Sequence, residues 1–340
     1  MKSRTFLALF VSAILLASCG KTTYSFGNYE DYTKRTLSFS ENMRVLQITD
    51  SHWGIGSNLD LEEQYITGLV NKANPDIIVL DGDMFMHANR KIVDRFFTLI
   101  DSFNIPFCYA YGNHDLQGQY SSTYIDESVK KRTNSLLVND LNDGLFGRSN
   151  YYVNLVDASG NVVWQVLIMD SNSYVTSGHY DIFHEDQVSW YRSIVTETTT
   201  RNGNITVPQL AFYHIPGLYF RDALDEYLLT SEGRDNSLCD ALDNLSGNGT
   251  GCAREDVYHG YADDGIFDVM VELGSTKGIF VGHDHINNFH LDYQGIKLCY
   301  NLKAGQNIYH DNRLFGGQVI EIHSDGTFNV ERIPLGYEGL

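Results

Sequence analysis

The chain has 340 residues, of which 43% are hydrophobic and 20% are charged, a composition typical of a globular protein. This length can bury one large core or two small ones, and we expect a single folded domain. The net charge of -19 argues against a long nucleic acid as a partner, because an acidic surface repels phosphate backbones and no basic run offsets it.

The first residues have the pattern of an export signal. Lys2 and Arg4 precede an apolar run at 6–16, which is too short to span a bilayer comfortably. The sequence Leu16-Ala17-Ser18-Cys19 follows and resembles a bacterial lipobox, so we expect cleavage after residue 18 and lipidation of Cys19. The protein is then predicted to be an exported cell-envelope lipoprotein held at the membrane by its lipid. The alternative is an ordinary secretory signal with an incidental cysteine.

These features divide the chain into a lipoprotein signal peptide at 1–18, a polar tether at 19–40, and a folded domain at 41–340. Two cysteines, Cys239 and Cys252, flank a polar loop rich in glycine and asparagine. In an oxidising compartment, these two cysteines are predicted to form a short-loop disulfide.

The first half of the folded part alternates strand and helix patterns. Apolar runs predict buried strands at 43–49, 77–80 and 105–110, and helical spacing of apolar residues predicts a helix in each interval. Parallel strands joined by crossover helices place functional residues at the carboxyl ends of the strands.

The second half is less regular. Further strands and helices are predicted at 151–156, 162–169, 185–197, 209–213, 266–273, 278–281, 289–302 and 317–333. Residues 222–262 are acidic, rich in glycine and asparagine and poor in apolar residues, and are predicted to form a surface excursion.

Polar clusters follow five of the predicted strands. Their candidate ligands are Asp50, His52, Asp83, Asn113, His214, His283 and His285. Carboxylate, imidazole and amide groups suit zinc, manganese or iron. Seven ligands are too many for one tetrahedral ion, but they fit two ions about 3.5–4 Å apart that share a carboxylate. Asp83 is the expected bridge, because the adjacent Gly82 permits a tight bend. Each residue alone also has a structural explanation, such as a cap or a turn, and only their conjunction favours a metal site.

Asp-x-His, Gly-Asp, Gly-Asn-His-Asp, a lone histidine and Gly-His-x-His occur here in that order. This pattern resembles the calcineurin-like metallophosphoesterases over about residues 43–335, in a branch related to purple acid phosphatases. The resemblance implies a four-layer αββα sandwich of two mixed sheets. The sequence departs from purple enzymes at His52, where they have glycine, and at Met86, where they have a metal-binding tyrosine, so no tyrosinate colour is expected.

The resemblance also implies roles for the candidate residues. The first metal ion would take Asp50, His52, Asp83 and His285, and the second would take Asp83, Asn113, His214 and His283. A hydroxide held between the two ions would attack the phosphorus of a small phosphate ester. His114 would bind a phosphoryl oxygen or protonate the leaving group. Asp115 would orient His114 or cap the following helix. Apart from the resemblance, Arg313 in a glycine-flanked loop is a candidate to grip a phosphate oxygen, and the alternative is a solvated surface arginine.

A phosphomonoesterase is the favoured function, and a phosphodiesterase with the same ligands is the alternative. A non-catalytic binding module would be favoured by a broken ligand set, whereas all seven ligands are present. A serine hydrolase would need an activated serine, but Ser51 lies in no Gly-x-Ser-x-Gly turn. Loops at 171–183, 217–262 and 303–315 are predicted to shape the substrate pocket.

Overall fold

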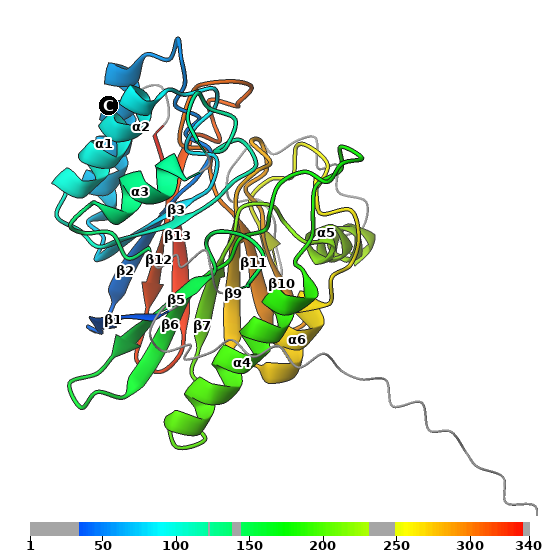
Figure 1. The fold of residues 1–340 in the computed structure, drawn as a ribbon. Coiled ribbons are helices and arrows are strands. Elements are labelled where there is room, and N and C mark those ends of the chain that lie inside the picture. The colour runs from blue at the N-terminus through cyan, green and yellow to red at the C-terminus, as the bar shows by residue number, and fades with distance from the viewer. Residues whose placement is uncertain (1–33, 122, 138–143, 231–248, 336–340) are drawn as a thin grey trace, which may run out of the picture.

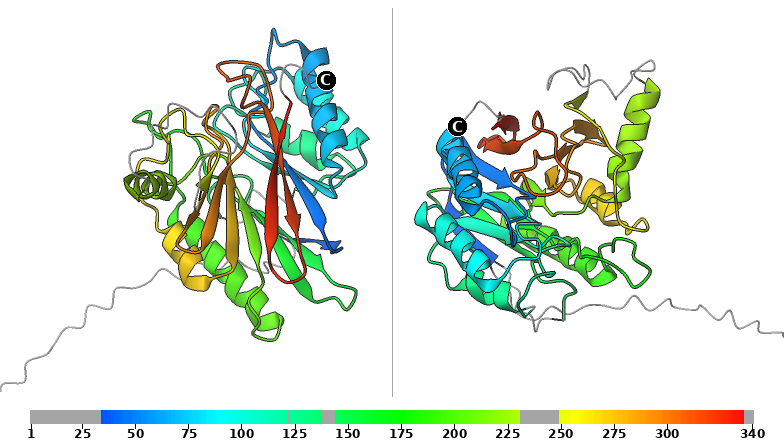
Figure 2. Two further views of the ribbon diagram at one scale, coloured as in Figure 1. Left: turned by 180° about the vertical axis from the view of Figure 1, so that it is seen from behind. Right: turned by 90° about the horizontal axis from the view of Figure 1, so that it is seen from above.

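The computed structural model describes residues 34–121, 123–137, 144–230 and 249–335. In this part of the chain, two β-sheets face each other and helices cover their outer surfaces (Figure 1). Helices α1 (Leu59–Ala73), α2 (Arg90–Ser102) and α3 (Tyr124–Lys130) lie outside one sheet. Helices α4 (Glu185–Arg201), α5 (Leu218–Thr230) and α6 (Ile266–Leu273) lie on the other side of the molecule (Figure 2). The predicted four-layer αββα sandwich is confirmed.

The smaller sheet has the strand order β13-β12-β2-β3-β4. Its strands are β2 (Met43–Ile48), β3 (Ile77–Asp81), β4 (Phe107–Ala110), β12 (Gly316–Ile322) and β13 (Phe328–Pro334). Strands β2, β3 and β4 are parallel to one another, with α1 and α2 as the crossovers. Strand β12 pairs antiparallel with both of its neighbours, β2 and β13. The predicted order of elements in the first half of the domain is therefore confirmed.

The larger sheet has the order β1-β5-β6-β7-β9-β11-β10-β8 and mixes parallel with antiparallel pairs. Its strands are β1 (Lys34–Ser38), β5 (Tyr151–Val156), β6 (Val162–Ile168), β7 (Gln209–Phe212), β8 (Gly249–Thr250), β9 (Thr276–Val281), β10 (His290–Tyr293) and β11 (Ile296–Tyr300).

Consecutive residues of the central strands belong to two different cores. Val166 and Ile168 of β6 pack in the cluster that contains the apolar residues of the smaller sheet, whereas Leu167 packs with the residues of α4 and α6. Side chains alternate across a strand, so a strand covered on both faces must be apolar throughout. The apolar runs that identified these strands in the sequence are unbroken because both faces of each strand are covered.

The structure corrects two sequence expectations and adds detail to a third. Residues 34–38 were expected in the tether, but they form β1, which pairs in parallel with β5 from Lys34↔Tyr152 to Ser38↔Val156. An edge strand is held by backbone pairing, so its side chains need no apolar pattern. Residues 222–262 were predicted to form a surface excursion, and residues 222–230 of this range belong to helix α5. Glu255 and Tyr258 line the candidate site, as expected for a segment that shapes the pocket. The sequence also predicts a helical stretch around residues 122–138, whereas the helix in the described part of this range, α3, ends at Lys130.

The signal peptide, Cys19 and Cys239 lie outside the described residues, so lipidation and the disulfide stay predictions; Cys252 itself is buried. Within the described ranges, no helix is both long enough and apolar enough to cross a bilayer.

Candidate metal centre

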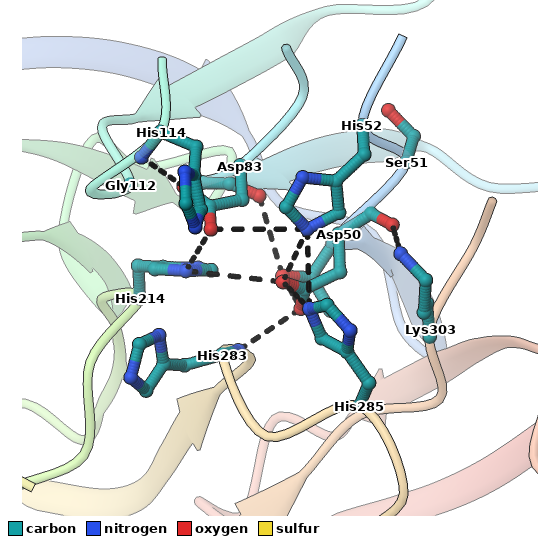
Figure 3. Close-up of polar contacts among 12 residues, drawn as sticks. Asp50, Ser51, His52, Asp83, Gly112, His114, His214, His283, His285 and Lys303 are labelled. Carbon is teal, nitrogen blue, oxygen red and sulfur yellow. Dashed lines mark hydrogen bonds and ion pairs between the residues drawn. The ribbon is translucent and has the colours of Figure 1, made fainter. Parts of the chain in front are cut away.

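The seven predicted ligands lie at the edge of the sandwich where the parallel strands end. Figure 3 labels six of them, which lie close together: Asp50, His52, Asp83, His214, His283 and His285. The seven ligands follow β2, β3, β4, β7 and β9, and each is at most 8% exposed. Parallel strands deliver their carboxyl ends to one edge, which explains why residues far apart in sequence converge there.

The first ligand group consists of Asp50, His52 and His285. The Nε2 atoms of the two rings are 3.1 Å apart, and they lie 3.4 and 3.3 Å from Asp50 Oδ1. That oxygen is buried and has no hydrogen-bond partner. In His285, Nδ1 faces the carbonyl oxygen of Tyr309 at 3.0 Å. A ring that donates from Nδ1 presents the Nε2 lone pair, so the group has the donor set of a metal site.

The second ligand group consists of Asp83, His214 and His283. His214 Nε2 lies 3.1 Å from Asp83 Oδ2, and His214 Nδ1 faces the carbonyl oxygen of Asp81 at 2.9 Å. Asp83 Oδ2 is also 3.8 Å from His52 Nε2, while Asp83 Oδ1 accepts from the backbone N–H of His114 at 2.7 Å. One oxygen of Asp83 therefore lies between the two groups, as a bridging ligand requires.

Asn113 lies in the loop beside Asp83, because the next residue, His114, donates its backbone N–H to Asp83 Oδ1. Its Oδ1 is buried without a hydrogen-bond partner, and its Nδ2 donates to the hydroxyl of Tyr174 at 2.9 Å. Tyr174 thus holds the amide so that its oxygen is left free of hydrogen bonds and would be the atom that contacts a metal ion. Together with the unpartnered Asp50 oxygen, this arrangement fits two divalent ions better than a hydrogen-bonded polar core.

The pKa values describe how the ligands are charged before metal binding. Burial lowers the pKa of His52 and of His283 to about 3, aided by Lys303 at His52 and by His214 at His283, so both rings are neutral near pH 7. Burial opposes ionisation of Asp50 and Asp83, but the nearby histidines, His214 first, hold both pKa values below the usual range. Against the effect of burial, Asp83 and Asp50 raise the pKa of His214 to about 10. A metal ion at this group would therefore compete with a proton for His214.

Four of the ligand residues have a left-handed backbone. The φ angles are 55° at Asp50, 48° at His52, 53° at Asp83 and 77° at His283. This conformation costs non-glycine residues on the order of 1 kcal/mol each. Such strain persists only where the surrounding structure enforces it, so the ligand loops hold their geometry at the expense of stability.

Glycines beside the ligands make room for ligands from other loops. A Cβ at Gly112 would overlap Asp83, one at Gly82 would lie 2.6 Å from the ring of His214, and one at Gly282 would lie 2.6 Å from Asp50 Oδ2. Gly82 also has φ +80°, as the predicted tight bend requires. At Gly112, where a sharp turn was expected, the requirement is space, because its φ is not positive.

The sequence did not reveal Lys303. Its side chain is 1% exposed, and Nζ donates to the backbone carbonyl of Asp50 at 2.6 Å (Figure 3). Burial lowers the pKa of this ammonium group to about 8. The lysine therefore holds the backbone of the first ligand loop in place at Asp50. Because it bonds to a backbone atom, no motif identifies it.

Three residues beyond the ligand set were assigned roles from the sequence. His114 lines the cavity beside Asp83, and its Nδ1 contacts Gln117 Oε1 at 2.7 Å. Asp115 does not orient that ring. Its carboxylate accepts from the backbone N–H groups of Asp83, Phe85 and Gly112 at 2.8–3.0 Å and so joins two ligand loops.

Arg313 is not placed for the expected phosphate contact. Its guanidinium group pairs with Asp311 in the same loop, and it does not line the cavity. An exposed arginine in a glycine-flanked loop gives no sequence signal that separates a ligand contact from a local ion pair.

A cavity of about 370 Å³ opens over the ligand groups. Besides ligands, its walls include His114, Tyr180, Glu255, Tyr258, Asp284, Ile308 and Tyr309. The residues outside the ligand loops come from the three segments that were expected to shape the pocket. Among described residues, no lysine or arginine lines this cavity, so ions bound to the ligands would supply its positive charge.

The comparisons with known proteins agree with this geometry. The family model of the calcineurin-like phosphoesterases matches residues 43–287. Two similar proteins of Arabidopsis thaliana are named probable inactive purple acid phosphatases 14 and 28. Number 14 is 25% identical over 89% of this chain and 79% of its own length. Number 28 is 24% identical over 82% of this chain and 77% of its own length.

A solved structure, a dimetal phosphatase from Danio rerio, has a similar fold, with a TM-score of 0.52 and 11% identity over 84% of this chain and 94% of that chain. The family model covers well over half of the chain, and its length includes the strand ends that carry the ligands. The chain therefore belongs to the calcineurin-like phosphoesterase family.

Proposed function

We propose that this protein hydrolyses small phosphate monoesters at a centre of two divalent ions, with Mn, Zn or Fe as the candidate metals. The observation that carries the proposal is the convergence of two buried ligand groups on Asp83, with unpartnered oxygens of Asp50 and Asn113 beside them. Bound divalent ions supply Lewis acidity and lower the pKa of coordinated water toward neutrality.

The protein's own residues hold the ester and handle its proton. His114 lines the cavity, and its Nδ1 contact with Gln117 leaves Nε2 for a phosphoryl or leaving oxygen. Proton donation from this ring to the leaving oxygen is the proposed general-acid step. Tyr180, Tyr258 and Tyr309 line this cavity of about 370 Å³, a volume that favours a small substrate over a polymer.

Two alternatives remain as rival proposals. A phosphodiesterase would use the same ligands and differ only in the groups that the walls admit. A non-catalytic binding module has support from the names of relatives described as probable inactive phosphatases, whereas the complete ligand set supports catalysis.

The test is hydrolysis of a chromogenic phosphate monoester and its matched diester, after chelation and after addition of Mn, Zn or Fe. Asn113→Ala and His114→Ala are measured in parallel. We expect metal-dependent turnover of the monoester, with reduced metal affinity in the Asn113 variant and normal metal content in the His114 variant. Preferential turnover of the diester would favour the diesterase. Metal binding without turnover of either ester would favour the binding module.

We also propose that Cys19 is lipidated and anchors the enzyme in a bacterial cell envelope, as the lipobox resemblance suggests. Mass spectrometry of the mature N-terminus tests this: a diacylglyceryl group on Cys19 is expected, and an unmodified N-terminus would contradict it.

A further inference from the structure

A second cavity of about 590 Å³ lies beside the metal cavity. The two share Tyr180 and Tyr258 as walls. Its lining contains four tyrosines, namely Tyr174, Tyr180, Tyr258 and Tyr261. Three of these are at least 43% exposed, Tyr174, Tyr258 and Tyr261. Large exposed rings that gather around one cavity next to a reaction site indicate a surface for binding.

The tyrosines are held in place by backbone contacts. Asp181 N–H donates to Ser173 O, and Val175 N–H donates to His179 O, so a short hairpin sets Tyr174 across from Tyr180. Their ring centroids are 5.2 Å apart. Tyr261 N–H donates to Tyr180 O at 3.0 Å and so attaches the second segment of tyrosines to the hairpin.

Two tyrosines connect this cavity to the metal ligands. The hydroxyl of Tyr174 accepts from Asn113 Nδ2 at 2.9 Å. The ring of Tyr180 packs edge-on against the ring of His283, with centroids 4.4 Å apart. Residues that line the second cavity are therefore in direct contact with predicted metal ligands.

The two cavities differ in charge. The metal cavity is lined by Asp83, Glu255 and Asp284 and by no described lysine or arginine. The second cavity is lined by Arg221 of α5, whose Nη1 lies 3.5 Å from His259 Nε2, and by no described aspartate or glutamate. A guanidinium group and tyrosine rings both stack on planar rings. Val257 is the one aliphatic residue in this described lining apart from glycines, so a long alkyl chain fits less well.

Building on the proposed phosphomonoesterase activity, we propose that the second cavity binds the alcohol part of the ester and selects alcohols that carry a planar ring. Water adds to phosphorus, the bond from phosphorus to the ester oxygen breaks, and that oxygen keeps the electron pair and takes up a proton. The products are inorganic phosphate and an aryl or nucleoside alcohol. A nucleoside and a simple aryl group share the planar ring, and the test separates them.

The test uses the metal-loaded protein with benzyl phosphate, adenosine 5′-monophosphate and glycerol phosphate, all of which are esters of alkyl alcohols and so have similar leaving groups. We expect kcat/KM to be about tenfold higher for at least one ring-bearing ester than for glycerol phosphate, since stacking on one aromatic residue contributes that much. The better of the two ring-bearing esters identifies the source of the ring. Equal kcat/KM for all three esters would overturn the proposal.

The variants locate the selectivity. In Tyr261→Ala, the preference for the ring-bearing ester over glycerol phosphate should fall by about fivefold, whereas Tyr261→Phe should keep it. Phe146→Ala is the matched control, because Phe146 is an exposed ring outside both cavities. An equal loss in Tyr261→Ala and Phe146→Ala would contradict the proposed location.

A binding measurement separates this proposal from the proposed function. Phenylphosphonate and methylphosphonate cannot be hydrolysed, and their affinities for the metal-loaded protein are measured by calorimetry. Tighter binding of phenylphosphonate than of methylphosphonate, lost in Tyr261→Ala, would support ring binding in the second cavity. If this result came without turnover of any ester, only the phosphatase proposal would fail. Equal affinities for phenylphosphonate and methylphosphonate would rule out ring binding in the second cavity, even if esters are turned over rapidly.

Discussion

The ligand loops and the outer cavity walls surround the same space but are built differently. Each ligand residue is at most 8% exposed, and backbone, glycine and carboxylate contacts fix its position. The walls instead present half-exposed rings, such as Tyr258 at 47% and Tyr309 at 52%. Metal chemistry demands fixed positions within tenths of an ångström, whereas recognition of a leaving group tolerates adjustable rings. We therefore expect changes in the ligand loops to abolish activity and changes in the walls to alter preference.

Gly112→Ala should have the largest effect. The new methyl group would overlap the side chain and backbone of Asp83 and so displace the bridging ligand. We expect a loss of activity of about a thousandfold, which corresponds to ~4 kcal/mol of transition-state stabilisation, together with loss of bound metal. Gly317→Ala is the control, because a Cβ there meets nothing closer than 3.1 Å. Normal metal content in Gly112→Ala would contradict the close-packing argument.

Asp115→Ala tests what joins the ligand loops. The substitution leaves three buried backbone N–H groups without their acceptor, which we expect to reduce the free energy of unfolding by about 3 kcal/mol. Asp115→Asn retains one acceptor oxygen, so its free energy of unfolding should decrease less than that of Asp115→Ala. Urea unfolding measures both variants. Equal stability of wild type and Asp115→Ala would show that the carboxylate does not join the loops.

Glu62 contacts the segment 303–315, which forms part of the cavity wall. Its buried carboxyl group is expected to make the stability of the protein depend on pH. It accepts from the backbone N–H of Gln306, and burial raises its pKa from 4.5 to about 7. Between those pH values the folded state binds a proton that the unfolded state has lost, so this residue makes stability fall as pH rises through the window. We expect a decrease of about 2 kcal/mol that is absent in Glu62→Gln. Parallel stability profiles of the two proteins between pH 4.5 and 7 would refute this assignment.

Arg313→Ala should have the smallest effect. The guanidinium group pairs with Asp311 and lies outside both cavities, so we expect KM for the preferred ester to change by less than about twofold, within the range of an exposed ion pair. A tenfold rise in KM would restore the phosphate-binding role that the sequence had suggested.

The same contrast explains what the sequence could predict. Asp50, His52 and the other ligands follow apolar runs, and their residue types are dictated by metal chemistry, so strand patterns and motifs identified them together. Lys303 was missed because it bonds to a backbone carbonyl, which any donor of the right length can reach. Tyr174 and Tyr180 were missed because a local hairpin brings them together, and no periodicity predicts that contact. Strand β1 was missed because its edge position needs no apolar pattern.

The most direct test of the two-ion centre is the number of metal ions bound per chain, measured by elemental analysis and calorimetry in wild type and in Asp83→Asn. The arrangement around Asp83 predicts two ions per wild-type chain and weakened binding of both ions in the variant, because one carboxylate oxygen serves both ligand groups. A wild-type protein that binds a single ion, or a variant that retains both ions at unchanged affinity, would contradict the account.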